Sequence, residues 1–173
     1  MLLQRVYALA RHPNPFKRLG AMLTLARVYR EFRESDMLVR AHTLELLDHA
    51  LACLRLAHND ADALETAQRA SEVVAALKKI VADASKQKWR LLLVPTVVTQ
   101  GHCRDLHAFS HWLVEQLIAP ETEYRRRCAD LLETFVPLLV QSSGNKEQTS
   151  GKVRRLFSPC IFFSHNKRLS VYC

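Results

Sequence analysis

Apolar residues along most of this chain recur every three or four positions, the spacing that places side chains on one face of an α-helix. Three such stretches span residues 2–10, 15–33 and 104–118. A fourth follows Ser35 and runs to Leu54, and a fifth follows Asn59 or Asp60 and runs to Val81. A sixth begins at Pro120. No comparable series of alternating, strand-like positions is present. The pattern therefore predicts an all-α fold of six helices before residue 140.

The second of these stretches has the widest apolar pattern. Asn14 stands before Pro15, and these residue types favour the cap and the first position of a helix. At about 100° per residue, its apolar positions cover an arc of roughly 240°. We therefore expect a helix buried on more than one side, with Leu19 and Leu23 touching both neighbours. Gly20, which is unfavourable in a helix, predicts close backbone approach by one of them.

The segment 85–102 interrupts the helical pattern. Basic residues flank Trp89, and strand-like residues run from Thr96 to Thr99. We expect a long loop with some hydrophobic anchoring; a short β-hairpin is the alternative, although it would have no partner sheet.

Two parts of the chain are expected, a helical segment over residues 1–139 and a flexible, disordered basic tail over 140–173. Pro137 should kink or end the last helix, and residues 141–145 read as a connector. The tail supplies +5 of the net charge of +8, and such tails bind nucleic acid or keep a protein solvated. From about residue 153 the tail is either non-native read-through, suggested by Lys152-Val153-Arg154, or a divergent flexible end.

Composition narrows the class of protein. Apolar residues make up 49% of the 173 residues and only 4 are glycine, which suits helices. No apolar run is long enough for a membrane span, and the apolar run at the N-terminus breaks too early for a secretion signal. The 5 cysteines are widely scattered, which favours reduced thiols in an intracellular protein.

Consecutive amphipathic helices in pairs of about 40 residues are typical of HEAT or armadillo repeats. The second and third helices would form one pair, and the fifth and sixth another. We expect an α-solenoid fragment truncated at both ends; a compact helical bundle is the alternative.

Four phrases of the sequence share one resemblance. They are Pro15–Ala21 with Val28–Glu34, then Leu54–Asp60, His111–Val114, and Pro120–Arg125 with Phe135–Leu139. In this order they resemble the helical-repeat region of the family of DNA-dependent protein kinase catalytic subunits, which are phosphatidylinositol-kinase-related kinases. The resemblance spans about residues 12–139.

The resemblance implies a nuclear serine/threonine kinase as the parent protein, acting in DNA double-strand-break repair by non-homologous end joining. This chain would be a non-catalytic scaffold segment of it. Its partners would be other parts of the parent kinase, the Ku heterodimer and DNA ends, with no cofactor, membrane or small-molecule substrate. The alternatives are a stand-alone helical-repeat adaptor for a protein or peptide, and an isolated basic nucleic-acid-binding domain, although no module for specific recognition is evident.

The sequence gives little indication of a catalytic site. Cys103-Arg104-Asp105-Leu106 echoes the catalytic loop of protein kinases, but Ser110 stands where that motif has a metal-binding Asn. The sequence also has no Gly-rich phosphate loop and no Asp-Phe-Gly. We therefore expect no catalytic residues.

A metal site is not expected either. Cys103, His107 and His111 are spaced to share a helix face and have zinc-binding side chains. The first and last would, however, lie about 12 Å apart along the helix axis, too far for one ion. His102 only partly remedies this.

Two further features are candidates for modification or charge contacts. Thr99-Gln100 has the form that kinases of the resembled family phosphorylate, so Thr99 is a candidate phosphosite. The run 125–127 is three arginines, which we interpret as a solvated helix face, with a nuclear-import signal or phosphate contact as the alternatives.

Overall fold

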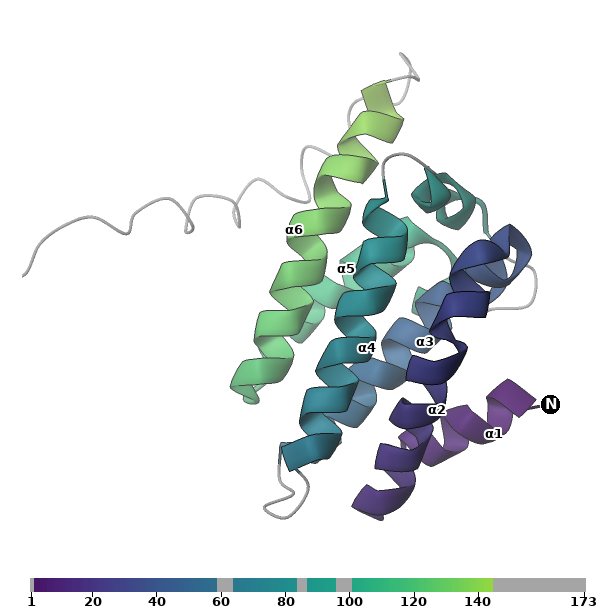
Figure 1. Ribbon diagram of the computed structural model, residues 1–173. Helices are drawn as coiled ribbons and strands as arrows, with labels where there is room; N and C mark the ends of the chain where they lie inside the picture. The colour runs from purple at the N-terminus through teal and green to yellow at the C-terminus, as the bar shows by residue number, and fades with distance from the viewer. Residues whose placement is uncertain (1, 59–63, 84–86, 96–100, 145–173) are drawn as a thin grey trace, which may run out of the picture. The chain divides into compact units, whose positions relative to one another are not determined.

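The computed structural model describes residues 2–58, 64–83, 87–95 and 101–144 (Figure 1). The elements are α1 (Leu2–Ala10), α2 (Pro15–Glu34), α3 (Asp36–Ala57), α4 (Leu64–Ala82), the 3₁₀-helices η1 (Lys88–Leu93) and η2 (Gly101–Arg104), α5 (Leu106–Gln116) and α6 (Thr122–Gly144). The described residues contain no strand, and the all-α prediction is confirmed. Internal contacts group Met1–Leu139 into one compact unit and Val140–Cys173 into another.

The caps that define α2 and α3 are those that the sequence predicts. The side-chain oxygen of Asn14 accepts hydrogen bonds from the backbone N–H groups of Phe16 at 2.9 Å and Lys17 at 3.4 Å. Ser35 ends α2 and also caps α3, where its hydroxyl accepts from the N–H of Leu38 at 3.4 Å. One residue therefore separates the two helices, and its side chain fixes where the second begins.

The helix α3 is the centre of the first unit. It contacts α1, α2, α4, η1 and η2, and Figure 1 shows it behind α2 and α4. Its buried residues are Val39, Thr43, Leu44, Leu46, Leu47, Asp48, Ala50, Leu51, Cys53, Leu54 and Ala57. At about 100° per residue they cover an arc of roughly 220°. This is the helix that is buried on more than one side.

The burial of α2 differs from the prediction. Its buried positions, Arg18, Ala21, Met22, Leu25 and Phe32, project over an arc of only about 100°. Leu23 is 40% exposed and Phe16 75% exposed, and a Cβ on Gly20 would meet nothing within 4 Å. Burial of α2 on more than one side and a close approach at Gly20 were therefore wrong predictions, because the side of the helix that carries Phe16, Gly20 and Leu23 is largely exposed.

The predicted loop between α4 and α5 is partly helical. Trp89 and Leu92 of η1 are buried, and η1 contacts α3 and α4. Lys88, also buried, lies 3.2 Å from the carboxylate of Asp36 and donates to the carbonyl of Arg33. The predicted hydrophobic anchoring is confirmed over residues 87–95, but this part is a 3₁₀-helix rather than an irregular loop or a hairpin.

The last two helices begin and end differently from the prediction. α5 begins after Asp105, whose carboxylate accepts from the N–H of Ala108 at 2.8 Å. α6 passes Pro137 and continues to Gly144, so residues 140–144 are helical rather than a connector. Pro137 removes the hydrogen bond to the Glu133 carbonyl, but both residues are exposed, where water can satisfy that oxygen. The tail predicted beyond Gly144 lies outside the described residues.

Candidate functional site

The structure does not bring together the three residues first considered for zinc. Cys103 is buried in η2, before α5 begins, so it does not share a helical face with His107 and His111. Both histidines are exposed, and the ring of His111 lies 3.4 Å from Glu115. Cys103 instead faces α3, where its thiol donates to the carbonyl of Leu44 at 3.7 Å.

The kinase-like quartet, the stretch Cys103-Arg104-Asp105-Leu106 that resembles the catalytic loop of protein kinases, has a structural role. Asp105 is buried, caps α5 through one carboxylate oxygen, and lies 3.0 Å from Arg104 Nε through the other. Ser110, where the kinase motif has a metal-binding Asn, is buried inside α5. A carboxylate already occupied by a helix N-terminus and an arginine is poorly placed to act as a catalytic base.

Two of the three consecutive arginines are bound to groups in their own helix or in the turn just before it. Arg125 donates to the carbonyls of Ala119 at 2.7 Å and Pro120 at 3.1 Å. The Nε of Arg127 lies 2.9 Å from Glu123, and Arg126 alone is mostly exposed. The run is therefore not a continuous free basic surface. Thr99, the candidate phosphosite, lies outside the described residues and remains a prediction.

A polar cluster joins Arg11, the residue just after α1, to α3, η2 and α5. Asp48 Oδ2 accepts a hydrogen bond from Arg11 at 2.5 Å, and Asp48 Oδ1 lies 3.2 Å from His102 Nε2. The ring of His102 stacks on Trp112, with centroids 4.3 Å apart. Cys103 follows directly, and ligand-type atoms of Asp48, His102 and Cys103 all lie within 4.8 Å of one another. Sequence spacing missed this group because Asp48 is far from His102 along the chain.

Burial shifts the pKa values of Cys103 in this cluster and of His49 beside it. Burial raises the pKa of the Cys103 thiol to about 12, and the carboxylates of Asp48 and Glu45 act in the same direction. The free thiol is therefore protonated at neutral pH. Burial also lowers the pKa of His49, and the neighbouring guanidinium of Arg11, which donates to His49 Nδ1 at 2.9 Å, adds to this shift.

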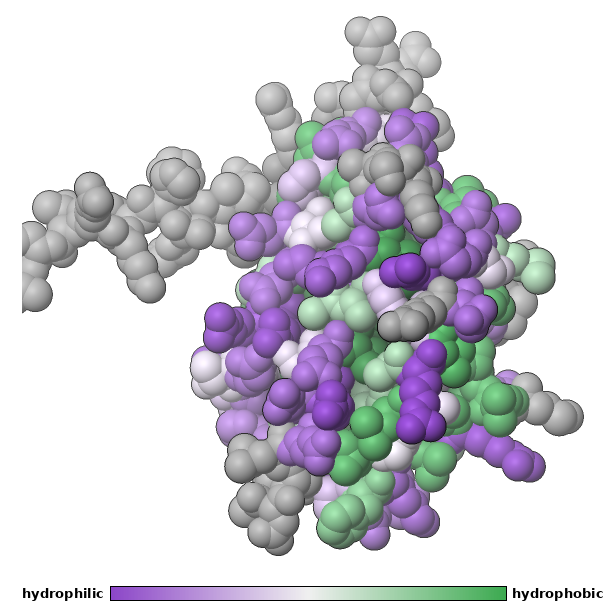
Figure 2. All heavy atoms as spheres, in the orientation of Figure 1, coloured by the Kyte–Doolittle hydropathy of each residue, from purple (hydrophilic) through white to green (hydrophobic). Residues whose placement is uncertain are grey.

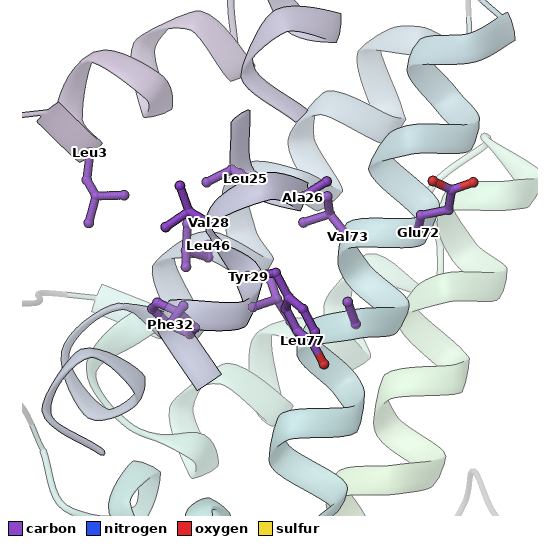
Figure 3. A pocket seen from close by; sticks show the side chains of 11 residues that line it. Leu3, Leu25, Ala26, Val28, Tyr29, Phe32, Leu46, Glu72, Val73 and Leu77 are labelled. Carbon is purple, nitrogen blue, oxygen red and sulfur yellow. The ribbon is translucent and has the colours of Figure 1, made fainter. Parts of the chain in front are cut away.

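An apolar groove runs between α2 and α4, with α3 as its floor (Figure 3). Its cavity has a volume of about 180 Å³. The lining is almost entirely apolar and consists of Leu3, Leu25, Ala26, Val28, Tyr29, Phe32, Leu46, Glu72, Val73, Ala76 and Leu77. On the face drawn in Figure 2, apolar surface gathers around α2 and α4 among polar side chains.

The size and chemistry of the groove favour contact with protein rather than with a cofactor. Small-molecule sites usually enclose at least about 300 Å³ and include convergent polar groups. The only charged residue of this lining is Glu72, which already pairs with Arg69 of its own helix at 2.9 Å. A cavity of this volume suits one or two apolar side chains from a neighbouring helix.

The outer side of α2 is a second apolar surface. We use the name outer stripe for Phe16, Leu19 and Leu23, which follow the spacing i, i+3 and i+7 and therefore lie on one side of the helix. Leu19 is half-buried, whereas Phe16 and Leu23 are exposed. The outer stripe projects away from the buried arc of Ala21 and Leu25.

Known proteins match this chain over most of its length. Residues 1–155 match the family described as DNA-dependent protein kinase catalytic subunit, CC1/2. The DNA-dependent protein kinase catalytic subunit of Xenopus laevis is 40% identical over 151 residues, which is 86% of this chain and 4% of that protein. Those of Gallus gallus and Mus musculus are each 37% identical, over 170 and 149 residues, or 96% and 84% of this chain and again 4% of each relative.

The matches also show how much of this chain and how much of each relative are similar. The chain spans about 4% of the length of these curated relatives. The family match ends at residue 155 rather than at residue 139, where the similarity evident from the sequence phrases ends.

No helix in the described ranges is both long and apolar enough to cross a bilayer.

Proposed function

The chain belongs to the family of the DNA-dependent protein kinase catalytic subunit, and we propose that it is a non-catalytic scaffold segment of such a kinase. The parent would be a nuclear serine/threonine kinase that acts in double-strand-break repair by non-homologous end joining. Other parts of the parent would be the direct contacts of this segment. The Ku heterodimer and DNA ends would be partners of the assembled protein.

The outer stripe of α2 is the observation that carries this proposal. α2 buries one arc of side chains inside the unit and presents Phe16 and Leu23 on another side. A helix with apolar residues on two sides is stabilised fully only when it has neighbours on both. Helical repeats have this property, because each repeat contributes an interface to the next one.

The groove between α2 and α4 supports the same role. Val28 lines it and is 45% exposed, so apolar surface continues from the groove onto α2. An amphipathic helix that packs on such a groove inserts apolar side chains spaced three and four residues apart. The fragment would thus supply contact surface to the longer protein.

The use of the kinase-like quartet in helix capping supports a non-catalytic role. Asp105 fixes the start of α5, and Arg104 pairs with it. In this proposal, phosphate transfer belongs to another part of the parent, and this segment contributes by holding its neighbours in place.

The test uses the full-length protein that carries this segment. Phe16→Glu and Leu23→Glu together should lower its thermal stability and its support of end joining, because two carboxylates would be buried against the neighbouring repeat. Leu56→Glu is the matched control, since Leu56 on α3 is 42% exposed but lies outside the outer stripe. Unchanged stability and end joining in the double variant would contradict the scaffold proposal.

A further inference from the structure

Three different metal-binding side chains meet where η2 lies against α3. Asp48 offers a carboxylate oxygen, His102 an imidazole nitrogen and Cys103 a sulfur. Zinc binds all three types, whereas magnesium and calcium prefer sets made of oxygen alone. The chemistry of the group therefore favours zinc over the hard cations.

The separations in the cluster are close to those of a zinc site. With the usual zinc bond lengths, two ligand atoms of a tetrahedral site lie about 3.4 to 3.6 Å apart. The nitrogen of His102 and the nearer oxygen of Asp48 are 3.2 Å apart, and no pair in the group exceeds 4.8 Å. Because no pair exceeds 4.8 Å, an approach of the Cys103 sulfur by about 1 Å at most, with release of its hydrogen bond to the Leu44 carbonyl, would complete a three-ligand arrangement with water as the fourth ligand.

The unusual feature of this group is the state of His102. Its Nε2 atom is buried and makes no hydrogen bond among the described residues, although an oxygen of Asp48 is near. Buried polar atoms are nearly always satisfied, and a nitrogen held near a carboxylate oxygen without a hydrogen bond to it is placed to share an ion with that oxygen. Stacking on Trp112 holds the ring in this orientation.

The neighbouring charges suit a divalent ion. Arg11 occupies the outer oxygen of Asp48 and leaves the other oxygen facing His102. Such an outer contact orients a ligating carboxylate in known metal sites. A zinc ion would be neutralised by the carboxylate of Asp48 and the thiolate of Cys103, whose proton would leave to solvent.

We propose that Asp48, His102 and Cys103 bind a zinc ion that fastens η2 to α3. The ion would couple the segment between α4 and α5 to the central helix of the unit. This role is structural and is independent of any partner of the segment.

Cobalt(II) provides the direct test, because it replaces zinc in such sites and is coloured. Titration of the reduced 173-residue chain with cobalt(II) should give visible bands of a tetrahedral ion and a sulfur-to-cobalt charge-transfer band, saturating at one ion per chain. Added zinc should displace the cobalt and remove these bands. Zinc should also raise the melting temperature in proportion to the logarithm of its concentration.

Single substitutions assign the ligands. Cys103→Ala should remove the charge-transfer band, and His102→Asn should weaken metal affinity by at least about tenfold, since loss of an outer-shell partner alone costs that much. His107→Asn and His111→Asn are matched controls, since both histidines are exposed nearby and should leave the titration unchanged. Circular dichroism of each metal-free variant establishes that it folds.

The proposal is overturned by any of three results. One is the absence of the charge-transfer band in the folded, reduced chain. Another is a band that survives Cys103→Ala, which would assign the sulfur to a different cysteine. The third is loss of binding in the His107 or His111 variant with retention in His102→Asn, which would place the ion on the exposed face of α5.

Discussion

The helices α2 and α3 meet at Ser35 and have similar lengths, yet they are buried differently. α3 is covered around most of its circumference by helices on several sides. α2 contacts α1, α3 and α4, but its buried residues project over a narrower arc, and Phe16 and Leu23 of its outer stripe are exposed. Both helices carry apolar residues beyond a single narrow stripe, so the difference lies in what surrounds them.

The comparison shows that a wide apolar pattern on a helix can arise in two ways: from burial within the unit, or from an apolar side that stays exposed. In α3 the pattern is satisfied within the unit and supplies its core. In α2 it divides into a buried arc around Met22 and Leu25 and an outer stripe around Leu23. Periodicity identifies a side chain that is stabilised by burial, but it does not identify the element that buries it.

The largest expected effect comes from truncating the same residue type in the two helices. Leu47→Ala in α3 should lower the free energy of unfolding by about 2–5 kcal/mol, because Leu47 is 0% exposed and leaves a cavity. Leu23→Ala in α2 should cost less than about 1 kcal/mol, since its side chain is already partly in water. Urea denaturation followed by circular dichroism measures both. Equal costs would mean that the two helices are buried alike.

A second prediction concerns Cys53, which lies in the buried arc of α3. Burial raises its pKa from 9.0 to about 11, partly offset by Arg18. Below pH 9 the thiol is protonated in both states, and this part of the stability is fully present. As the pH rises from 9 to 11, the unfolded state loses the proton while the folded state keeps it, so stability falls.

The measurement for Cys53 is the pH dependence of unfolding. Cys53→Ala should show a shallower loss of stability across that range than the unmodified chain. Leu23→Ala, on the outer side of α2, should retain the original slope. Parallel curves for Cys53→Ala and the unmodified chain would mean that this thiol is not buried in the folded state.

Much of the local structure was predictable because it depends on neighbours in sequence. Asn14 and Ser35 act as caps through hydrogen bonds to N–H groups two or three residues later, which the residue types indicate directly. Asp105 is also a residue type that favours a helix cap, but we considered it only as part of the stretch that resembles a kinase catalytic loop. The helical course through Pro137 was not predictable, because it depends on exposure of the freed carbonyl.

The candidate sites were less predictable because they depend on distant segments. His102 and Cys103 are close in sequence to the histidines of α5, so the only metal site that spacing suggested lay along that helix, where the distances exclude one ion. Their nearest charged partner is Asp48 on α3, and only the packing of η2 against α3 reveals it. The groove likewise combines residues from four helices, and no single segment encodes it.

A third prediction tests the open space beside α2. Gly20→Ala should raise the free energy of unfolding by about 0.5–1 kcal/mol, because alanine favours helix and its Cβ meets nothing within 4 Å. Thermal denaturation of the isolated chain measures this gain. A loss of stability would indicate a close neighbour at this position and restore the first interpretation of the glycine.

The smallest effect on folding is expected from Leu23→Glu. Substitutions at exposed helix positions usually change stability by no more than about 0.5 kcal/mol, and Leu23 points away from the core of the unit. Its exposure, together with that of Phe16, should however promote contact between chains. Sedimentation velocity should show that the unmodified chain self-associates as concentration rises, and that Leu23→Glu suppresses this while the melting temperature stays nearly constant.

The control for this last experiment is Leu56→Glu, which adds the same charge at an exposed leucine of α3. A carboxylate on the outer stripe disfavours its burial against another chain, whereas a carboxylate at Leu56 only changes the net charge. If both variants suppress association equally, general repulsion is the cause and the outer stripe is not the contact. If only Leu23→Glu acts, the side of α2 that remains uncovered within this unit is the surface that the chain uses to meet a neighbouring helix.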